Sequence, residues 1–279
     1  MTSNQRVAVV TGTSSGIGQE ISLTLARNGF LTYATMRNLN KKENIKSVVE
    51  KENLLLKIVM LDVTDERSVK DAVKSITAEA NRIDVLVNNA GYGLVGVFED
   101  LAMEEIKSQF DTNLFGVIRV TQAVLPIMRK QKSGIIVNMS SVAGRFGLPT
   151  QSAYVSTKFA IEGLSESIAY ELEPFGIKIL LVEPGAIRTN FANNMVAAKK
   201  SQNPDSPYLQ LMQNVARGFE HIVEGSSSAD VVAKVVLKAV TTENTSFRHL
   251  AGKDAETWMK EKSSMSDAEF YKMMKEQMK

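Results

Sequence analysis

Residues 7–18 read VAVVTGTSSGIG, a short run of small and β-branched residues followed directly by a turn that contains three glycines. The apolar run predicts a buried strand of a parallel sheet. Helical periodicity then continues through Leu25 and ends at Asn28-Gly29, a C-terminal capping signal. We therefore expect a strand, a glycine turn and a helix in direct succession.

This arrangement predicts a site for a diphosphate, because backbone N–H groups at the start of a helix can hold phosphate oxygens. The spacing is Gly-x-x-x-Gly-x-Gly, which differs from the usual Gly-x-Gly-x-x-Gly fingerprint and lacks the Gly-Lys-Ser/Thr of an NTPase loop. The simpler alternative is a glycine-rich turn without a ligand. The residues expected to hold the diphosphate are Gly12, Ser14, Ser15, Gly16, Ile17 and Gly18.

Strand and helix patterns alternate through the rest of the chain. Further strands are expected at 31–35, 54–61, 84–87, 135–139, 177–182 and 247–250, and helices at 40–52, 65–81, 103–130, 152–173 and 230–240. Pro126 could kink the longest of these helices. The alternation predicts an α/β fold with a doubly wound, mostly parallel, Rossmann-like sheet and helices on both faces, in a single domain over residues 1–279.

Two segments fall outside this alternation. Residues 190–227 mix apolar and aromatic residues with Asn, Ser and Pro, and they could either cover the active site as a lid or form a surface helix pair with its own small core. Residues 254–279 are rich in Met and Lys and have helical periodicity. We expect a helical tail that is solvated or faces another subunit.

The composition excludes several classes of protein. The 279 residues contain 33 basic and 31 acidic side chains without a basic block, which argues against nucleic-acid binding. There is no cysteine, so disulfides and thiolate metal sites are ruled out, and His221 and His249 have no partners in the sequence that indicate a metal site. We expect no signal peptide, no membrane span and a soluble, cytoplasmic protein.

The stretch Tyr154-Val155-Ser156-Thr157-Lys158 carries the strongest indication of chemistry. On a helix, residues four apart share a face, so the phenol and the ammonium should project side by side. A cation next to a phenol favours the phenolate, so we expect the pKa of Tyr154 to lie below its usual value of about 10. Such a tyrosine can exchange a proton with a carbonyl or alcohol oxygen, and the Ser141 hydroxyl could hold the same oxygen.

Taken together, these motifs resemble the short-chain dehydrogenase/reductase family in its short, single-domain branch. The resemblance covers roughly residues 6 to 190, with a weaker extension to about 250, and its six motifs occur in the family's order. They are Thr11-Gly12-x-x-x-Gly16-x-Gly18, Asn88-Asn89-Ala90-Gly91, Asn113, Ser141, Tyr154-x-x-x-Lys158 and Pro184-Gly185-x-Ile187-x-Thr189.

The resemblance implies a role for each of these positions. Tyr154 would be the general acid in reduction, Lys158 would lower its pKa and bind the nicotinamide ribose, and Ser141 would polarise the substrate oxygen. Asn113 would hold a water in the proton relay to Lys158. In the cofactor site, Asn89 would steady the adenosine side, Asp62 and Val63 would lie at the adenine, and Pro184, Gly185, Ile187 and Thr189 would surround the carboxamide.

The end of the second strand indicates which nicotinamide cofactor is bound. An acidic residue there would bind a ribose 2′-hydroxyl, whereas an arginine favours a 2′-phosphate. The sequence reads Ala34-Thr35-Met36-Arg37, so Arg37 predicts NADP(H). Ser15 departs from this pattern, because many NADP-binding members carry a second basic residue there.

The motifs and the resemblance together predict an NADP(H)-dependent oxidoreductase that interconverts a ketone and a secondary alcohol. The alternative is a sensor or scaffold that binds the cofactor without chemistry, but it would not need Asn113, Ser141, Tyr154 and Lys158 together. A metal-dependent alcohol dehydrogenase is a third possibility, and the chain lacks plausible zinc ligands for it. Residues 33–37 and the stretch after Gly91 are similar to hydroxysteroid and retinol dehydrogenase-like members. An apolar lid would suit a bulky lipophilic substrate, and it would also suit many others. The two longest helices predict a homo-dimer or homo-tetramer.

Overall fold

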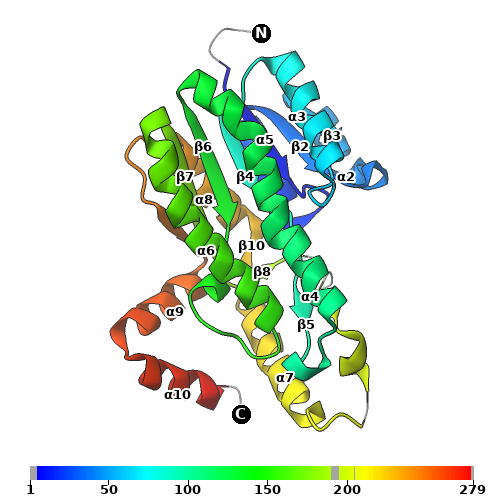
Figure 1. Ribbon diagram of the computed structural model, residues 1–279, viewed down its shortest axis with the longest axis vertical. Coiled ribbons are helices and arrows are strands. Elements are labelled where there is room, and N and C mark those ends of the chain that lie inside the picture. Colours follow the sequence, from blue (N-terminus) through cyan, green and yellow to red (C-terminus); the bar gives the residue numbers. More distant parts are fainter. Residues whose placement is uncertain (1–4, 190–194, 204, 278–279) are drawn as a thin grey trace.

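The computed structural model of the chain describes residues 5–189, 195–203 and 205–277. Its centre is a seven-stranded, wholly parallel sheet with the strand order β3-β2-β1-β4-β6-β7-β11 (Figure 1). This confirms the predicted doubly wound α/β sheet. The strands are β1 (Val7–Thr11), β2 (Leu31–Met36), β3 (Leu56–Met60), β4 (Val85–Asn88), β6 (Gly134–Met139), β7 (Ile177–Pro184) and β11 (Arg248–Ala251).

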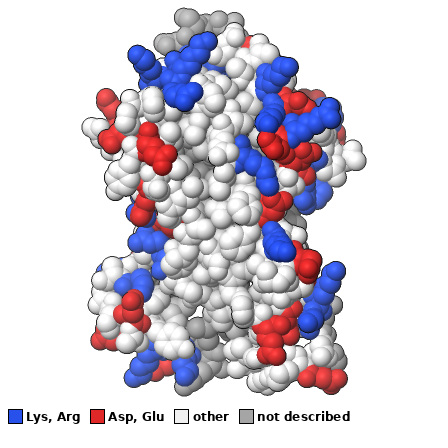
Figure 2. Space-filling view, in the orientation of Figure 1, with Lys and Arg blue, Asp and Glu red and all other residues white. Residues whose placement is uncertain are grey.

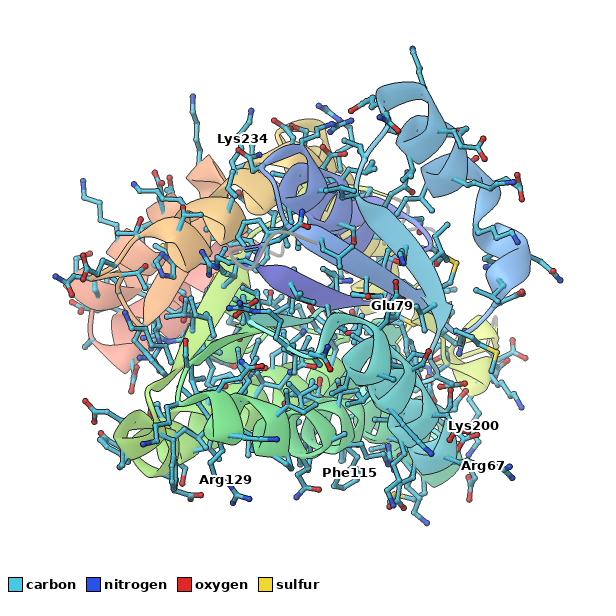
Figure 3. All side chains as sticks on the ribbon, turned by 90° about the horizontal axis from the view of Figure 1, so that it is seen from above. Arg67, Glu79, Phe115, Arg129, Lys200 and Lys234 are labelled. Carbon is cyan, nitrogen blue, oxygen red and sulfur yellow. The ribbon has the colours of Figure 1, made fainter. Side chains whose placement is uncertain are left out.

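Helices cover both faces of the sheet, and the two layers are seen edge-on in Figure 3. All of β1 is buried, with Val7 and Val9 in one apolar cluster and Ala8 and Val10 in another. Helices α3, α5 and α6 pack on the first side, and α1, α2 and α8 on the second. Their bounds are α1 (Gly16–Arg27), α2 (Glu43–Glu52), α3 (Glu66–Ala80), α5 (Gly116–Gln131), α6 (Ser152–Leu172) and α8 (Ala229–Thr241).

The strand order reverses next to β1. The chain builds β1, β2 and β3 outward in one direction and then returns to place β4 on the other side of β1. The loops after β1 and β4 therefore diverge and leave a crevice at the carboxyl ends of the strands, where open α/β sheets bind ligands.

The predicted helix over 103–130 is divided into α4 (Met103–Phe110), a π-helical turn (Asp111–Phe115) and α5. Pro126 lies inside α5, which continues past it to Gln131, so the irregularity lies near Asn113 and not at the proline. A single π turn inside a helix shifts its hydrogen bonds by one residue and is frequent at functional sites.

The tail over 254–279 is predicted to be helical and either solvated or subunit-facing; its described residues are helical, and one face of them packs on the same chain instead of being solvated. They form α9 (Lys253–Ser264) and α10 (Asp267–Gln277), which fold back onto the same chain. Phe146 packs edge-on against Trp258 and Phe270, with ring centroids 5.9 and 5.2 Å away. Burial of these aromatic side chains fixes the tail next to the turn that follows Ser141.

The segment over 190–227 forms short β9 (Val196–Ala197), a 3-10 turn (Lys199–Gln202) and α7 (Leu209–Glu224), while residues 190–194 and 204 lie outside the described part. Strand β9 pairs with β5 (Leu94–Val95), and β10 (Ser227–Ser228) pairs with β8 (Ile187–Arg188). In Figure 1, α7 lies beyond the carboxyl ends of the sheet, near α4. Among the described residues, none of the helices has the length and apolar character required to cross a bilayer.

Candidate active site

A cleft of about 650 Å³ opens at the carboxyl ends of the strands. It brings together every residue that the sequence placed at a cofactor, together with Ser141, Tyr154 and Lys158. The predicted cofactor residues that line it are Gly12, Ser14, Ser15, Gly16, Ile17, Gly18, Arg37, Asp62, Val63, Asn89, Pro184, Gly185, Ile187 and Thr189.

The glycine turn is built for close approach of backbone segments. Gly12 and Gly16 have φ of 70° and 63°, values that side-chain-bearing residues rarely adopt. A Cβ on Gly18 would lie 2.4 Å from both Asn89 Nδ2 and the Gly12 carbonyl oxygen. Helix α1 begins just after Ser15, whose side chain makes no capping hydrogen bond, and the first turn has no acidic residue. The first N–H groups of α1 thus suit the diphosphate of a dinucleotide.

The Asn-Asn-Ala-Gly turn after β4 braces the glycine turn from the side. Asn89 Nδ2 donates to the carbonyl oxygens of Thr11 and Gly12 at 2.9 and 3.0 Å. Thr11 Oγ1 accepts from the backbone N–H groups of Asn89 and Ala90, both at 3.0 Å. The Asn89 side chain therefore stabilises the conformation of the glycine turn by binding the backbone of that turn.

Tyr154, Lys158 and Ser141 meet at the inner end of the cleft. Helix α6 presents Tyr154 and Lys158 one turn apart, and both side chains are buried. Lys158 Nζ donates to the Met139 carbonyl oxygen at 2.7 Å and lies 5.5 Å from the centroid of the Tyr154 ring. The Ser141 hydroxyl, at the end of β6, hydrogen-bonds the Tyr154 phenol. Three groups able to exchange or hold a proton thus surround one point.

The expected lowering of the Tyr154 pKa is not found in the cofactor-free chain. Burial raises the pKa of Tyr154 to about 12, because the phenolate loses its water, and the Ser141 hydrogen bond only partly offsets this. Burial also lowers the pKa of Lys158 to about 8, against a raising effect of Glu162. The spacing of Tyr154 and Lys158 in the sequence shows the neighbouring charge, whereas the larger effect of desolvation depends on the packing around the phenol.

Asn113 lies behind the cleft and does not line it. Its Nδ2 donates to the Tyr92 carbonyl oxygen at 2.9 Å and to Thr157 Oγ1 at 3.3 Å, and its Oδ1 accepts from the Tyr92 N–H at 3.1 Å. The side chain is thus held by Tyr92, within the π-helical turn, and it contacts α6 between Tyr154 and Lys158. Its predicted part in a proton relay stays a prediction.

The outer end of the cleft is basic. Arg37 follows β2 directly and is exposed, and Lys41, from the next 3-10 turn, lines the same cleft. On the other side, Asp62 Oδ1 accepts from the N–H and hydroxyl of Thr64 at 2.9 and 2.7 Å, which fixes the loop after β3. Lys41 is a second basic side chain at this end of the cleft. The sequence pattern did not indicate it, because that pattern places the second basic residue at the position of Ser15.

The chain is similar in sequence to a family of known dehydrogenases. The family model of the short chain dehydrogenases matches residues 6–200. The chain belongs to the short-chain dehydrogenase/reductase family. It is 37% identical over 248 residues to 3-ketodihydrosphingosine reductase of Bacteroides thetaiotaomicron, covering 88% of each chain. It is 38% identical over 254 residues to retinol dehydrogenase 8 of Bos taurus, covering 87% of this chain and 80% of the relative.

A solved short-chain dehydrogenase from Streptomyces avermitilis has the same fold. It superposes with a TM-score of 0.83 at 34% identity, over 98% of this chain and 97% of the other. The family uses nicotinamide cofactors and acts on small-molecule substrates, so the glycine turn and the cleft of this short-chain dehydrogenase/reductase have the expected place in the fold.

Ser141 and Asp254 support the end of β7 and the loop that follows it. Ser141 Oγ donates to the Pro184 carbonyl oxygen at 3.3 Å. Asp254, from the start of α9, accepts from the Ala186 N–H at 2.5 Å. The sequence did not indicate Asp254, since it lies far from the family motifs and only the return of the tail brings it to the loop.

Proposed function

We propose that the chain is an NADP(H)-dependent oxidoreductase that reduces a ketone to a secondary alcohol and catalyses the reverse reaction. The observation that carries the proposal is the meeting of Tyr154, Ser141 and Lys158 at the inner end of a cleft that begins at the glycine turn. Each group has a side-chain proton or charge suited to a carbonyl oxygen.

The roles follow from the environment of each residue. Bound NADPH would supply a hydride to the carbonyl carbon. Tyr154 then gives its phenolic proton to the carbonyl oxygen, so that hydride and proton together yield the alcohol. Ser141 orients that oxygen, and the Lys158 ammonium stabilises the phenolate that remains. Because burial raises the pKa of Tyr154, the phenol is protonated at neutral pH and ready to act as the acid in reduction.

The preference for NADP(H) rests on the basic outer end of the cleft. Arg37 and Lys41 both line it, and no acidic residue stands at the end of β2. A guanidinium can bind a 2′-phosphate through two parallel hydrogen bonds, and an ammonium adds a second positive charge. Together they favour a phosphorylated ribose over one with a free hydroxyl.

A lipophilic substrate is supported by the segment that follows β8. Val196 lines the cleft, and Ala198 is buried against Leu94 and Ala153 at the start of α6. Tyr208 Oη donates to Glu99 at 2.7 Å, which ties the approach to α7 to the 3-10 turn Phe98–Asp100. Two similar proteins, a 3-ketodihydrosphingosine reductase and a retinol dehydrogenase, are named for bulky apolar substrates, which supports such a substrate for this chain. We infer that the described parts of the predicted lid over 190–227, residues 195–203 and 205–227, cover the substrate.

Replacement of Tyr154 by Phe tests the proposal. The variant keeps the ring and its packing but loses the proton donor, so the turnover number for ketone reduction should fall by about 10²–10⁴-fold. The dissociation constant for NADPH should stay within about twofold, because the dinucleotide is held mainly by the glycine turn and Arg37. Near-normal turnover of the variant on a ketone that the unmodified enzyme reduces would show that another group supplies the proton.

We also propose that the chain forms a homo-oligomer through α5 and α6. Figure 2 shows that the middle of the face over these helices carries few charged side chains. Phe115, Phe159, Tyr170 and Phe175 are exposed along it, with exposures from 41% to 79%, and Figure 3 shows Phe115 pointing outward. A second copy related by a two-fold axis would cover these rings with the same rings of its own.

A further inference from the structure

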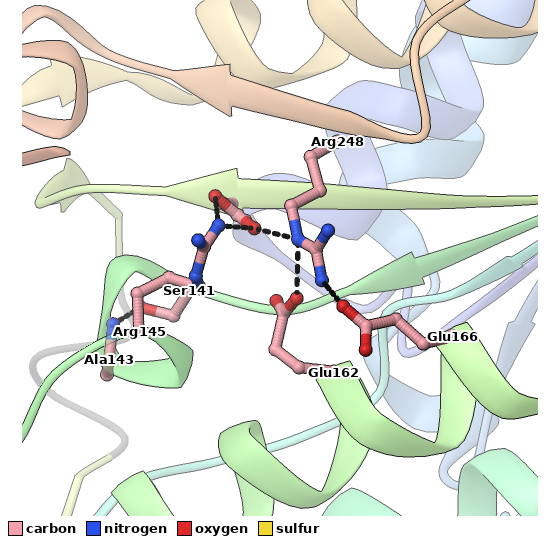
Figure 4. Close-up of polar contacts among 7 residues, drawn as sticks. Ser141, Ala143, Arg145, Glu162, Glu166 and Arg248 are labelled. Carbon is pink, nitrogen blue, oxygen red and sulfur yellow. Dashed lines mark hydrogen bonds and ion pairs between the residues drawn. The ribbon is translucent and has the colours of Figure 1, made fainter. Parts of the chain in front are cut away.

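A cluster of ion pairs lies behind Tyr154 and Lys158, and the proposed chemistry does not yet use it. Arg248, the first residue of β11, reaches between carboxylates on α6 and β7 (Figure 4). Its Nε lies 3.0 Å from Glu162 Oε2 and 3.2 Å from Glu183 Oε1. Its Nη2 pairs with Glu166, and Arg145 Nη1 lies 3.0 Å from Glu183 Oε1. The cluster therefore joins α6, β7, β11 and the turn after Ser141.

Glu162 is the member of the cluster closest to the chemistry along the chain. It follows Lys158 by one helical turn on the same face of α6. Lys158 is 8% exposed and Glu162 is 6% exposed, so both side chains are largely shielded from water. The hydrogen bond from Lys158 Nζ to the Met139 carbonyl oxygen provides a dipole but no compensating charge. Glu162 is thus the buried carboxylate that can stabilise the ammonium.

The remaining groups around this pair decide whether Glu162 itself is ionised. Burial raises the pKa of Glu162 above its usual range and Glu183 adds to this rise, while the Ser140 hydroxyl and Arg248 offset it in part. The geometry between Ser140 and Glu162 falls short of a hydrogen bond, since Ser140 Oγ and Glu162 Oε1 have no such partner among the described residues. Arg248, whose Nε lies 3.0 Å from Glu162 Oε2, is therefore the main group that favours the charged form of Glu162.

We propose that Glu162 is a positioning residue that keeps Lys158 charged at neutral pH, with Arg248 of β11 holding Glu162 ionised. This rests on the proposed function, in which the Lys158 ammonium stabilises the Tyr154 phenolate. It also gives the C-terminal strand a part in the chemistry, although no residue of β11 lines the cleft.

The first test measures the ionisation of Lys158 without substrate or cofactor. Lysine labelled with ¹³C at Cε is titrated by NMR, and the Lys158 signal is identified by its loss in Lys158→Met. Glu162→Gln keeps the size of the side chain and removes its charge, so the Lys158 midpoint should fall from about 8 by about one pH unit or more. Glu166→Gln is the matched control, because Glu166 also pairs with Arg248 but is 55% exposed and lies two turns from Lys158.

The midpoint of the Lys158 NMR titration in each variant either supports or overturns the proposal. A fall in Glu162→Gln with a change of no more than about 0.3 pH units in Glu166→Gln supports it. An unchanged midpoint in Glu162→Gln, or an equal fall in both variants, overturns it. If Glu162→Gln does not fold, Glu162→Met removes the same charge with an apolar side chain of similar length, and the same outcomes apply.

A second measurement separates this inference from the proposed function. If the Lys158 ammonium is required, the pH profile of kcat/KM for ketone reduction should have an alkaline limb where Lys158 loses its proton. In Glu162→Gln that limb should move to lower pH by the same amount as the NMR midpoint. If the NMR midpoint moves and the limb does not, Glu162 still controls the charge of Lys158, and the assumed role of that charge in the reaction is wrong.

Discussion

Replacing Lys158 by Met should make the cofactor-free protein more stable at neutral pH. The ammonium is buried, and its pKa falls from 10.5 in the unfolded chain to about 8 in the folded one. A lowering of about 2.5 at about 1.4 kcal/mol per pH unit means that the charge costs the folded state about 3 kcal/mol at pH 7. The variant loses the hydrogen bond to Met139, which contributed about 1 kcal/mol. We therefore expect a net gain of about 2 kcal/mol.

The pH dependence makes this prediction specific. Between its folded and unfolded pKa values, Lys158 binds fewer protons in the folded chain than in the unfolded chain. The stability of the unmodified protein should therefore rise with pH from about 8 to 10.5, a rise that Lys158→Met lacks. At pH 9.5 the advantage of the variant should shrink to less than about 1 kcal/mol.

The assay is urea unfolding of both proteins without cofactor at pH 7 and pH 9.5. Lys107→Met on α4 is the control, because this lysine is exposed and its replacement should change stability by less than about 0.5 kcal/mol at either pH. The reasoning is refuted if Lys158→Met is less stable than the unmodified chain at pH 7. An advantage of equal size at both pH values would refute it as well.

Three further predictions concern the cofactor site and the subunit interface. Arg37→Ala should raise the dissociation constant for NADPH by about 10- to 150-fold, the equivalent of about 1.5–3 kcal/mol. The dissociation constant for NADH should stay nearly unchanged. Fluorescence titration measures both constants, and Arg67→Ala, at an exposed position of α3, is the control. Gly18→Ala should abolish binding of either cofactor, because its Cβ would lie 2.4 Å from two neighbouring atoms, whereas Gly163→Ala, with nothing within 4 Å, should bind normally. Phe159→Glu should dissociate the oligomer in light scattering, and Tyr271→Glu on α10 should not; a monomer mass for the unmodified chain would contradict the proposed interface.

The succession of strands and helices could be predicted from the amino-acid sequence alone, because apolar periodicity and glycine turns are local properties of the chain. The sequence also indicated the glycine turn, the Tyr154–Lys158 pair and Arg37, since each of these motifs lies within a few residues. The limits of the elements shifted by a few residues, and the π turn at Asn113 was not foreseen, because one extra residue in a helical turn leaves no mark in the apolar pattern.

Only the tertiary structure decided which distant residues meet at the site. Arg248 reaches Glu162 and Asp254 reaches Ala186, although nothing in their local sequence requires it. The tertiary structure also reversed the expected direction of the Tyr154 pKa. Spacing along a helix shows which charge is near, whereas the loss of water around a group depends on every element that packs over it.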